Sequence, residues 1–150
     1  MSDKQIQSLV ALARATAVKH SLSPDLVCAV VEQESSWNTW AIRFEPVFEQ
    51  RYIHPALPSA PTTEEMSLAV SWGLMQVMGQ SAREHGFRDR FFTNLCRPEI
   101  GLEIGCRILS YKWAQGEGNV EATLQRWNGG GNPRYASEVV ARMKRYGDSG

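Results

Sequence analysis

The sequence predicts an all-α (mainly helical) protein with little or no β-structure, organised as one domain over residues 1–150. Apolar residues recur at intervals of three and four in segment after segment, which is the spacing of amphipathic helices. No segment shows the sustained alternation of apolar and polar residues that would indicate a half-buried strand. A chain of 150 residues is long enough to bury a core without a disulfide or a metal ion.

Two helices are expected before residue 36. The first runs from about Asp3 to His20, because apolar residues share one face of it. These residues are Ile6, Leu9, Val10, Ala13 and Ala17. Ser23 is a good N-cap and Pro24 suits the first position of a helix, so a second helix is expected from there to about Glu34.

The stretch from Asn38 to Thr63 contains four prolines and is expected to be a loop with a short helix around Val47 to Tyr52. A loop of this length in a compact domain is usually functional. Two more short helices should follow, from Glu64 to Ala69 and from Gly79 to His85. Gly86 would end the second of them.

Three helices are expected in the remainder of the chain. A long one runs from Pro98 to Trp113, with isoleucines and a leucine on one face. The next is capped by Asn119 and reaches about Trp127, where a run of three glycines breaks it. The last runs from Pro133 to Tyr146 and carries an apolar stripe.

The charge and hydropathy of the chain exclude two classes of partner. Lysine and arginine together number 16, as do aspartate and glutamate, so the formal net charge is zero. No global basic field would draw the protein to nucleic acid. No apolar run approaches the roughly 20 residues that a membrane-spanning helix needs. We therefore expect no nucleic-acid partner and no membrane span.

The cysteines and histidines do not form a recognisable metal pattern. Cys28, Cys96 and Cys106 contain no CxxC pair, and the three histidines are scattered, so no metal and no cofactor is expected. Free cysteines within helical patterns indicate synthesis in a reducing compartment. The polar N-terminus, MSDKQIQ, does not resemble a signal peptide. We expect a monomer that is made in the cytoplasm.

Glu34 departs from the pattern of its helix. It lies on the apolar face, at a helical spacing from three valines, Val27, Val30 and Val31. Burial raises the pKa of a carboxyl group, and so does a position at the negative end of the helix dipole. Trp37 and Trp40 follow closely and are expected to exclude water from the site.

A carboxylic acid that stays protonated near neutral pH can protonate the leaving oxygen of a glycosidic bond. Position alone leaves two structural explanations open, since Glu34 could pair with an arginine or simply mark a frayed helix end. Glu32 projects to nearly the opposite side of the helix and is expected to be solvated.

Four short segments occur in a suggestive order: QESSW (33–37), WGLMQV (72–77), RWNGGGN (126–132) and RYASEVVAR (134–142). They resemble the motifs of soluble-type lytic transglycosylases and goose-type lysozymes. That family shows a Glu-Ser pair ending a helix, then GLMQ, a YNAG-like segment and a tyrosine in a final helix. PEIGLEIGCRIL (98–109) is similar to the family's long central helix. The resemblance spans about residues 23–147 and implies a lysozyme-like domain with a cleft between two lobes.

The resemblance assigns roles residue by residue. It matches Glu34 to the catalytic acid and Tyr135 to the tyrosine near that acid. The residues matched to substrate-binding positions, with Tyr135, are Met75, Gln76, Trp127 and Asn128. Trp127 stands where the family has a tyrosine. Core packing is the alternative role for Met75, Trp127 and Tyr135, and a helix cap is the alternative for Asn128.

The implied reaction is cleavage of the β-1,4 bond between N-acetylmuramic acid and N-acetylglucosamine in the glycan strands of bacterial peptidoglycan. A lytic transglycosylase needs one acid and forms 1,6-anhydro ends without consuming water. Goose-type lysozymes place an aspartate directly after GLMQV, whereas this chain has Met78, as in the transglycosylases. The resemblance therefore favours the ring-closing reaction.

Glu45 is a second candidate catalytic residue. It lies in the segment AIRFEPVFEQRY (41–52), where many soluble-type transglycosylases have a shorter segment, and it could hold a water for hydrolysis. Its alternative role is an ion pair with Arg43 or Arg51. Some phage lysins carry RFEP-like segments near the catalytic glutamate, so the resemblance extends to them. A phage lysin without a signal peptide would reach the cell wall through a pore in the host membrane.

Three competing functions remain. A hydrolysing muramidase of the same fold would give hydrated reducing ends. A non-catalytic glycan-binding module would keep the cleft without activity, although binding alone does not require a buried acid. A phage assembly protein with a lysozyme-like domain would be recognised by a stable complex with its partners.

Overall fold

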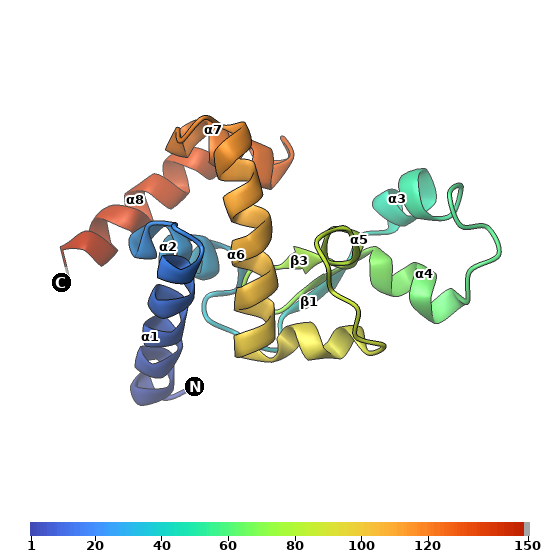
Figure 1. The fold of residues 1–150 in the computed structure, drawn as a ribbon, viewed down its shortest axis with the longest axis horizontal. Helices are drawn as coiled ribbons and strands as arrows, with labels where there is room; N and C mark the ends of the chain where they lie inside the picture. The colour runs from blue at the N-terminus through green and yellow to red at the C-terminus, as the bar shows by residue number, and fades with distance from the viewer. Residues whose placement is uncertain (149–150) are drawn as a thin grey trace.

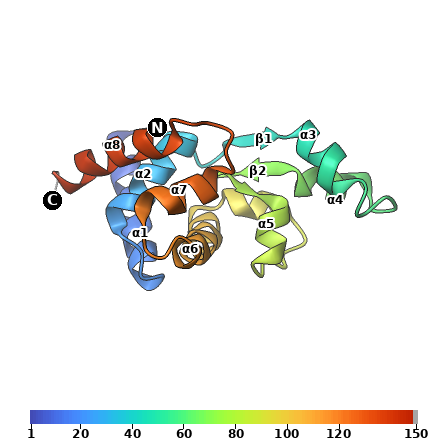
Figure 2. The same cartoon turned by 90° about the horizontal axis from the view of Figure 1, so that it is seen from above.

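The structure is a computed structural model that describes residues 1–148 and is mainly helical (Figure 1). The larger lobe contains the helices α1 (Asp3–Lys19), α2 (Pro24–Ser35), α6 (Pro98–Gln115), α7 (Val120–Asn128) and α8 (Tyr135–Gly147). The smaller lobe contains the strands β1 (Ile42–Phe44), β2 (Val70–Trp72) and β3 (Val77–Met78), and the helices α3 (Pro46–Phe48), α4 (Thr62–Leu68) and α5 (Gly79–Glu84). A π-helical turn (Glu49–Ile53) follows α3, and a 3₁₀ turn (Phe92–Cys96) precedes α6. Figure 2 shows the strands and α3 to α5 on one side of α6, and α1, α2 and α8 on the other.

Helix α2 is buried on all sides along the middle half of its length. The Ser23 hydroxyl accepts a hydrogen bond from the Leu26 amide, and Pro24 occupies the first turn, so the helix begins where the sequence indicates. Six consecutive residues, 26–31, are fully buried, which is typical of a helix that lies within a core. Helices α1 and α8 pack against it. Four consecutive polar residues, 32–35, therefore emerge together at its C-terminal end.

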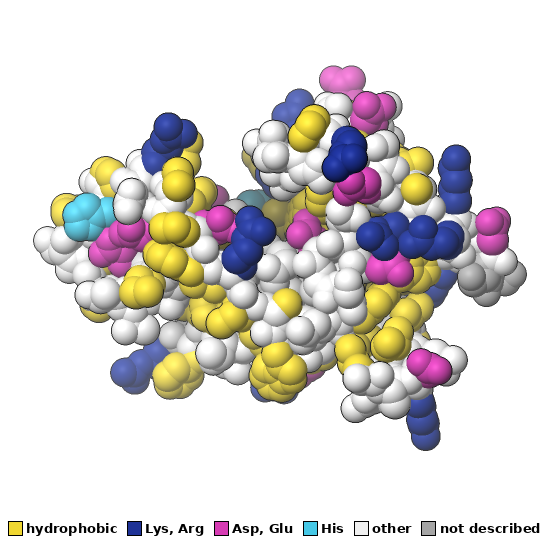
Figure 3. All heavy atoms as spheres, turned by 180° about the vertical axis from the view of Figure 1, so that it is seen from behind, with side chains coloured by type: hydrophobic (Ala, Val, Ile, Leu, Met, Phe, Trp, Pro, Cys, Tyr) yellow, Lys and Arg dark blue, Asp and Glu magenta, His cyan; other side chains and the backbone are white. Residues whose placement is uncertain are grey.

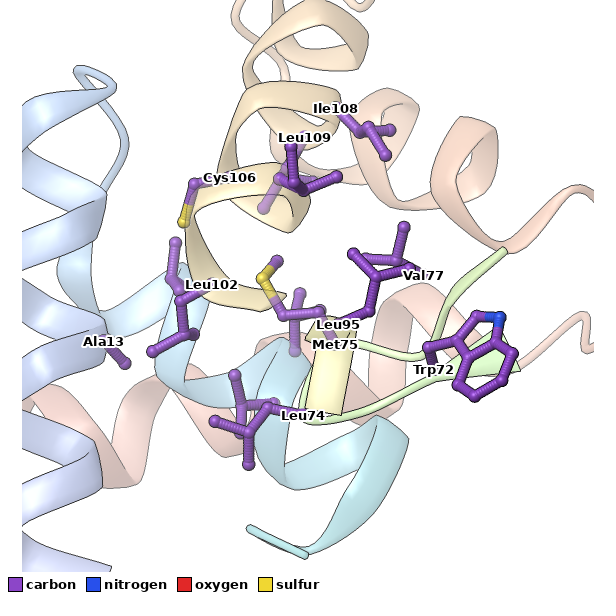
Figure 4. Close-up of a cluster of buried hydrophobic side chains, with 14 of the residues drawn as sticks. Ala13, Trp72, Leu74, Met75, Val77, Leu95, Leu102, Cys106, Ile108 and Leu109 are labelled. Atoms are coloured by element: carbon purple, nitrogen blue, oxygen red, sulfur yellow. The ribbon is translucent and has the colours of Figure 1, made fainter. Parts of the chain in front are cut away.

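Helix α6 joins the two lobes through a shared core (Figure 4). Met75, from the loop between β2 and β3, is fully buried against Gly105 of this helix. A β-carbon at Gly105 would lie 2.3 Å from the Met75 sulfur, so only glycine allows this close approach. Side chains from both lobes surround the contact: Leu74, Val77, Leu95, Leu102, Cys106, Ile108 and Leu109. The position of the small lobe is therefore fixed by apolar packing on α6.

The sheet is small and antiparallel, with the strand order β1-β2-β3. Arg43 pairs with Ser71, and Ser71 pairs with Met78, so these three residues form one row across the sheet. Residues directly opposite one another in a sheet point to the same face. The three residues of this row all line a cleft between the two lobes.

The expected helices are confirmed, most of them with ends that differ by one or two residues. The last helix begins at Tyr135 instead of Pro133, because Pro133 and Arg134 belong to the turn that precedes it. The expected short helix near Val47 is present as α3 and the π-helical turn. Strand β1, in contrast, was not expected inside the loop. Its three residues are too few to show an alternating pattern, and each of them is exposed.

The three cysteines are buried and unpaired within the described residues. Burial raises the pKa of Cys28 to about 11 and that of Cys106 to about 12, which keeps both thiols protonated and unreactive. In residues 1–148 no helix combines the length and apolarity that crossing a bilayer requires.

Candidate active site

The carboxyl group of Glu34 is held by two hydrogen bonds to one of its oxygens. The Tyr135 hydroxyl lies 2.6 Å from Oε1, and the Trp127 indole nitrogen lies 2.9 Å from the same atom, so both side chains donate to it. Tyr135 comes from the first turn of α8 and Trp127 from the last turn of α7. Helix α2 and the two consecutive helices α7 and α8, which are distant from it in sequence, therefore meet at one carboxyl oxygen.

The surroundings of Glu34 favour its protonated form. Burial raises the pKa of this carboxyl group above its usual range, while the hydrogen bonds from Tyr135 and Trp127 and the charge of Arg43 lower it in part. The direction agrees with the expectation from the sequence. The pKa of the buried Tyr135 hydroxyl is also raised, first by burial and then by the neighbouring Glu34 charge, so Tyr135 acts as a donor.

Glu34 faces a cleft of about 670 Å³ between the two lobes. The space-filling view shows the surface hollowed between the part built on α7 and the part that carries α3 and α4 (Figure 3). Residues of both lobes line the cleft: Gln33, Phe48, Gln76, Val77, Ser81, Ile108, Lys112, Trp127, Asn128, Gly131, Asn132 and Tyr135 on its sides, with Glu34, Glu45 and the sheet row of Arg43, Ser71 and Met78. This volume lies within the range of about 300–1,000 Å³ that is typical of ligand-binding pockets.

Glu45 lines the same cleft but is engaged in an ion pair. The Arg43 guanidinium contacts Glu45 Oε1, and the Glu45 amide donates to the Ala69 carbonyl, so the residue is tied to the sheet. The pKa of Arg43 is raised by this hydrogen bond and by the charge of Glu45. Of the two arginines considered from the sequence, Arg43 is thus the partner of Glu45.

Gln76 lines the cleft and also fastens the loop that carries it. Its backbone adopts a left-handed conformation with φ of +48°, which is uncommon for a residue other than glycine. Its side-chain amide donates to the carbonyls of Ala41 and Gly73, at 2.9 and 3.0 Å. From the other lobe, the Ser35 hydroxyl donates to the Leu74 carbonyl at 2.8 Å. These hydrogen bonds hold the loop between β2 and β3 directly beside Glu34.

Met75 does not line the cleft, which corrects the role implied by the resemblance. Its side chain is fully buried against Gly105, so it packs the core behind the cleft wall. The two tryptophans after Glu34 also lie elsewhere. Trp37 is buried and donates to the Tyr146 hydroxyl at 3.0 Å, while Trp40 is 74% exposed. Trp127, rather than either of them, covers the acid.

Asn128 lines the cleft at the end of α7 and belongs to a polar network that the sequence did not indicate. It donates to the Asn132 carbonyl, and Asn132 donates in turn to Glu138 of α8. Gln33, the neighbour of the acid, donates to the same Glu138 oxygen at 2.8 Å and accepts from Arg142 at 2.7 Å. The network fixes the glycine-rich segment against α2. Only the position of Gln33 next to Glu34 could have suggested it.

Glu32 is paired, contrary to the expectation of a solvated residue. Its Oε2 accepts hydrogen bonds from Arg142 and Arg145 of α8, both at 2.9 Å. Glu32 and Glu34, which lie on different sides of α2, thus both contact other helices, because α1 and α8 pack against α2 and α7 reaches its C-terminal end. The ion pairs align α8, which carries Tyr135, with the helix that carries the acid.

One histidine lies in a group that could hold a metal ion, outside the cleft. His54 and Glu65 form an ion pair of 2.6 Å at the far end of the small lobe, and a carboxyl oxygen of Glu49 lies within 4.8 Å of the same atoms. The sequence does not suggest this grouping, because Glu49 lies in the π-helical turn, His54 directly follows that turn, and Glu65 lies in α4.

Fold and site together define a class of protein. A mainly helical domain with two lobes, and a half-buried glutamic acid in the cleft between them, is the arrangement of lysozyme-like enzymes that cleave glycosidic bonds.

The comparison with family models identifies the family. The transglycosylase SLT domain model matches residues 11–145, so the chain belongs to this family. Its members are lytic transglycosylases, which cleave the glycosidic bonds of peptidoglycan, and the protein is an enzyme of this kind. No curated protein and no solved structure matches the chain.

Proposed function

We propose that the protein cleaves the β-1,4 bond between N-acetylmuramic acid and N-acetylglucosamine and leaves 1,6-anhydro ends, with Glu34 as the acid and then the base. The observation that carries this proposal is the carboxyl group of Glu34, half-buried in the cleft, with a raised pKa and two donors on one oxygen. A protonated acid of this kind is the group that a glycosidic leaving oxygen requires.

The two hydrogen bonds also indicate which oxygen acts. Tyr135 and Trp127 both donate to Oε1, so this oxygen must have lone pairs available and the proton resides on Oε2. When Oε2 gives its proton to the leaving oxygen, negative charge develops on the carboxylate. The two donors are already in place to stabilise that charge, without any movement of protein groups.

The reaction then proceeds with the substrate's own groups. The acetamido oxygen of the muramic acid attacks C1 while the bond from C1 to the leaving oxygen breaks. The leaving oxygen takes the proton of Glu34. The Glu34 carboxylate next removes the proton of the 6-hydroxyl, whose oxygen attacks C1 and releases the acetamido oxygen. The acid is regenerated, and an anhydro ring forms without water.

A second carboxylate is not required by this scheme, which agrees with the state of Glu45. A hydrolysing enzyme needs a base that can activate a water molecule. Glu45 is bound to Arg43, and Met78, which stands beside Ser71 in the row along the cleft wall, has no group that could remove a proton. Hydrolysis nevertheless remains the second candidate function, because Glu45 lines the same cleft as Glu34.

Mass spectrometry of the soluble products from purified peptidoglycan separates these functions. Anhydro ends, one water lighter than hydrolysis products, are expected. Fully hydrated reducing ends would instead make the protein a muramidase and give Glu45 a catalytic role. An absence of products, with retained binding, would support a glycan-binding or assembly function.

The variant Glu34→Gln tests the role of the acid. The amide has the same shape but no proton to donate, so the rate should fall by a factor of about 10² to 10⁴ or more. Glu45→Gln serves as the matched comparison and should keep anhydro products. Cleavage by Glu34→Gln at the rate of the unmodified protein would exclude Glu34 as the acid.

A further inference from the structure

The cleft contains one charge that the proposed reaction does not use. Four charged side chains line it, namely Glu34, Arg43, Glu45 and Lys112. Glu34 is held toward its neutral form, and Arg43 and Glu45 neutralise one another as an ion pair. Lys112 alone leaves the cleft with an uncompensated positive charge.

The position of Lys112 makes this charge a feature of the cleft wall. It lies in the last turn of α6, one turn after Ile108, and both side chains line the cleft. The residue is only partly exposed, and its ammonium group has no ion-pair or hydrogen-bond partner among residues 1–148.

A lysine near the C-terminal end of a helix is commonly explained by the helix dipole, which favours a cation there. That effect is satisfied equally well by a fully solvated side chain. It does not account for a lysine side chain that lines a cleft without a counter-charge there, because an unpaired charge on a cleft wall attracts ligands of the opposite sign. The unpaired charge of Lys112 on the cleft wall therefore indicates a ligand with negative charge.

We propose that Lys112 binds a carboxylate carried by the 3-O substituent of a muramic acid residue in the cleft. This inference rests on the proposed function, because it assumes a peptidoglycan strand as the occupant. The sugar rings of such a strand are neutral, since their amino groups are acetylated. Negative charge occurs only on the substituent, either as carboxylates of the stem peptide or, after the peptide has been removed, as the lactyl carboxylate.

Lys112 would therefore distinguish peptidoglycan from a neutral polymer of N-acetylglucosamine, which lacks the 3-O substituent. A second consequence concerns ionic strength. Attraction between a partly exposed ammonium group and a carboxylate weakens as salt is added, so the KM of the unmodified protein should rise with salt concentration.

The test compares Lys112→Gln with the unmodified protein on two substrates and one neutral inhibitor. The substrates are peptide-bearing strands and strands stripped of peptide by an amidase, and the inhibitor is chitotetraose. We expect KM to rise about threefold to tenfold on at least one substrate, with the inhibition constant of chitotetraose unchanged. A rise on peptide-bearing strands alone identifies a stem-peptide carboxylate, and a rise on stripped strands alone identifies the lactyl carboxylate.

Two further variants make the test specific. Lys112→Arg should restore the lower KM and the salt dependence, because it keeps the charge. Lys144→Gln, on the exposed face of α8 outside the cleft, is the matched control and should change neither value. An unchanged KM for Lys112→Gln on both substrates would overturn the proposal, and so would an equal loss of chitotetraose binding.

Failure of this proposal is distinguishable from failure of the proposed function. If Lys112 is irrelevant to binding, the unmodified protein and Lys112→Gln will cleave both substrates alike. If the proposed reaction is wrong, the unmodified protein will form no anhydro products from either substrate.

Discussion

One carboxyl oxygen of Glu34 accepts hydrogen bonds from Tyr135 and Trp127. Trp127 distinguishes this chain from the family motif that it resembles. Where the family pattern has a tyrosine, Trp127 donates its indole N–H to Glu34. An indole nitrogen can only donate, so it cannot compete for the proton of the acid. Trp127 therefore fixes the orientation of the carboxyl group and favours its charged form.

The variant Trp127→Phe should change both the rate and its dependence on pH. Loss of the donor raises the pKa of Glu34, because that hydrogen bond lowers it in the intact protein. Since the first step needs protonated Glu34, the decline of activity with rising pH should move to higher pH. The plateau rate should fall about tenfold to hundredfold, as expected for one hydrogen bond to a charged group.

Trp37→Phe is the matched control for this measurement. It removes an indole donor that bonds to Tyr146 outside the cleft, so the pH profile should keep its position. If the pH–rate profile of Trp127→Phe coincides with that of Trp37→Phe, the hydrogen bond from Trp127 to Glu34 does not contribute to catalysis.

Some of these residues could be predicted from the sequence and others could not. Glu34 was detectable because a carboxyl group stood on an apolar helix face. The buried position of Met75 could not be predicted, because a four-letter motif does not say which of two neighbours faces the cleft and which faces the core. Gln33 and Arg142 were missed because polar contacts between residues 109 positions apart leave no periodic signal.

Among the elements, helix α6 determines how the lobes fit together. Its glycines at 101 and 105 allow the 3₁₀ turn and the Met75 loop to approach the helix backbone closely. A β-carbon at Gly101 would lie 2.4 Å from the Leu95 carbonyl oxygen, and one at Gly105 would contact Met75. Glycine at these positions therefore serves packing, although it weakens the helix by itself.

The variant Gly105→Ala tests this packing. In an exposed helix the change would stabilise the protein by about 1 kcal/mol. Here we expect destabilisation by about 1–3 kcal/mol in denaturant unfolding, because the buried Met75 must move. The effect should shrink in a Met75→Ala background, as for residues in direct contact.

Gly131→Ala is a suitable control, since a β-carbon there meets no atom within 4 Å and should leave stability within about 0.5 kcal/mol. Stabilisation by Gly105→Ala, as in an ordinary helix, would mean that the close approach to Met75 has no energetic importance.

The elements also show where prediction from sequence ends. The long helices were predictable because each buries one face, or all faces, over several turns. The sheet was not, because strands of two or three residues are held by their register on neighbouring strands rather than by local preference.

For the whole molecule, we expect Glu34 in its ionised form to lower the free energy of unfolding, because its carboxylate is partly buried. Burial raises the pKa of Glu34, so the folded state binds its proton more tightly than the unfolded state does. The stability that this proton contributes is fully present below the ordinary pKa of glutamate. It is lost as the pH rises through the raised pKa of the folded protein.

Glu34→Gln should therefore have a higher Tm than the unmodified protein at pH values above the pKa of Glu34. The difference should disappear in acid, below the ordinary glutamate pKa, because both proteins then carry a neutral group at this position. Thermal unfolding at a series of pH values measures it. The control Glu117→Gln, in an exposed turn, should show no such trend, and a lower Tm for Glu34→Gln at neutral pH would contradict the argument.

Delivery of the enzyme to the cell wall, including passage through a phage-made pore, stays a prediction, as does a monomeric state. Neither depends on the geometry of the cleft.

The wide separation of the active-site residues along the chain has a consequence during synthesis. A ribosome makes Glu34 more than 90 residues before it makes Trp127 and about 100 before Tyr135, so the acid lacks both donors until α7 and α8 have been made. The buried run of α2 likewise awaits α8. Nascent chains that have not yet reached α8 are therefore expected to be inactive, so that the lytic activity arises only after Tyr135 has been made and α8 has packed against α2.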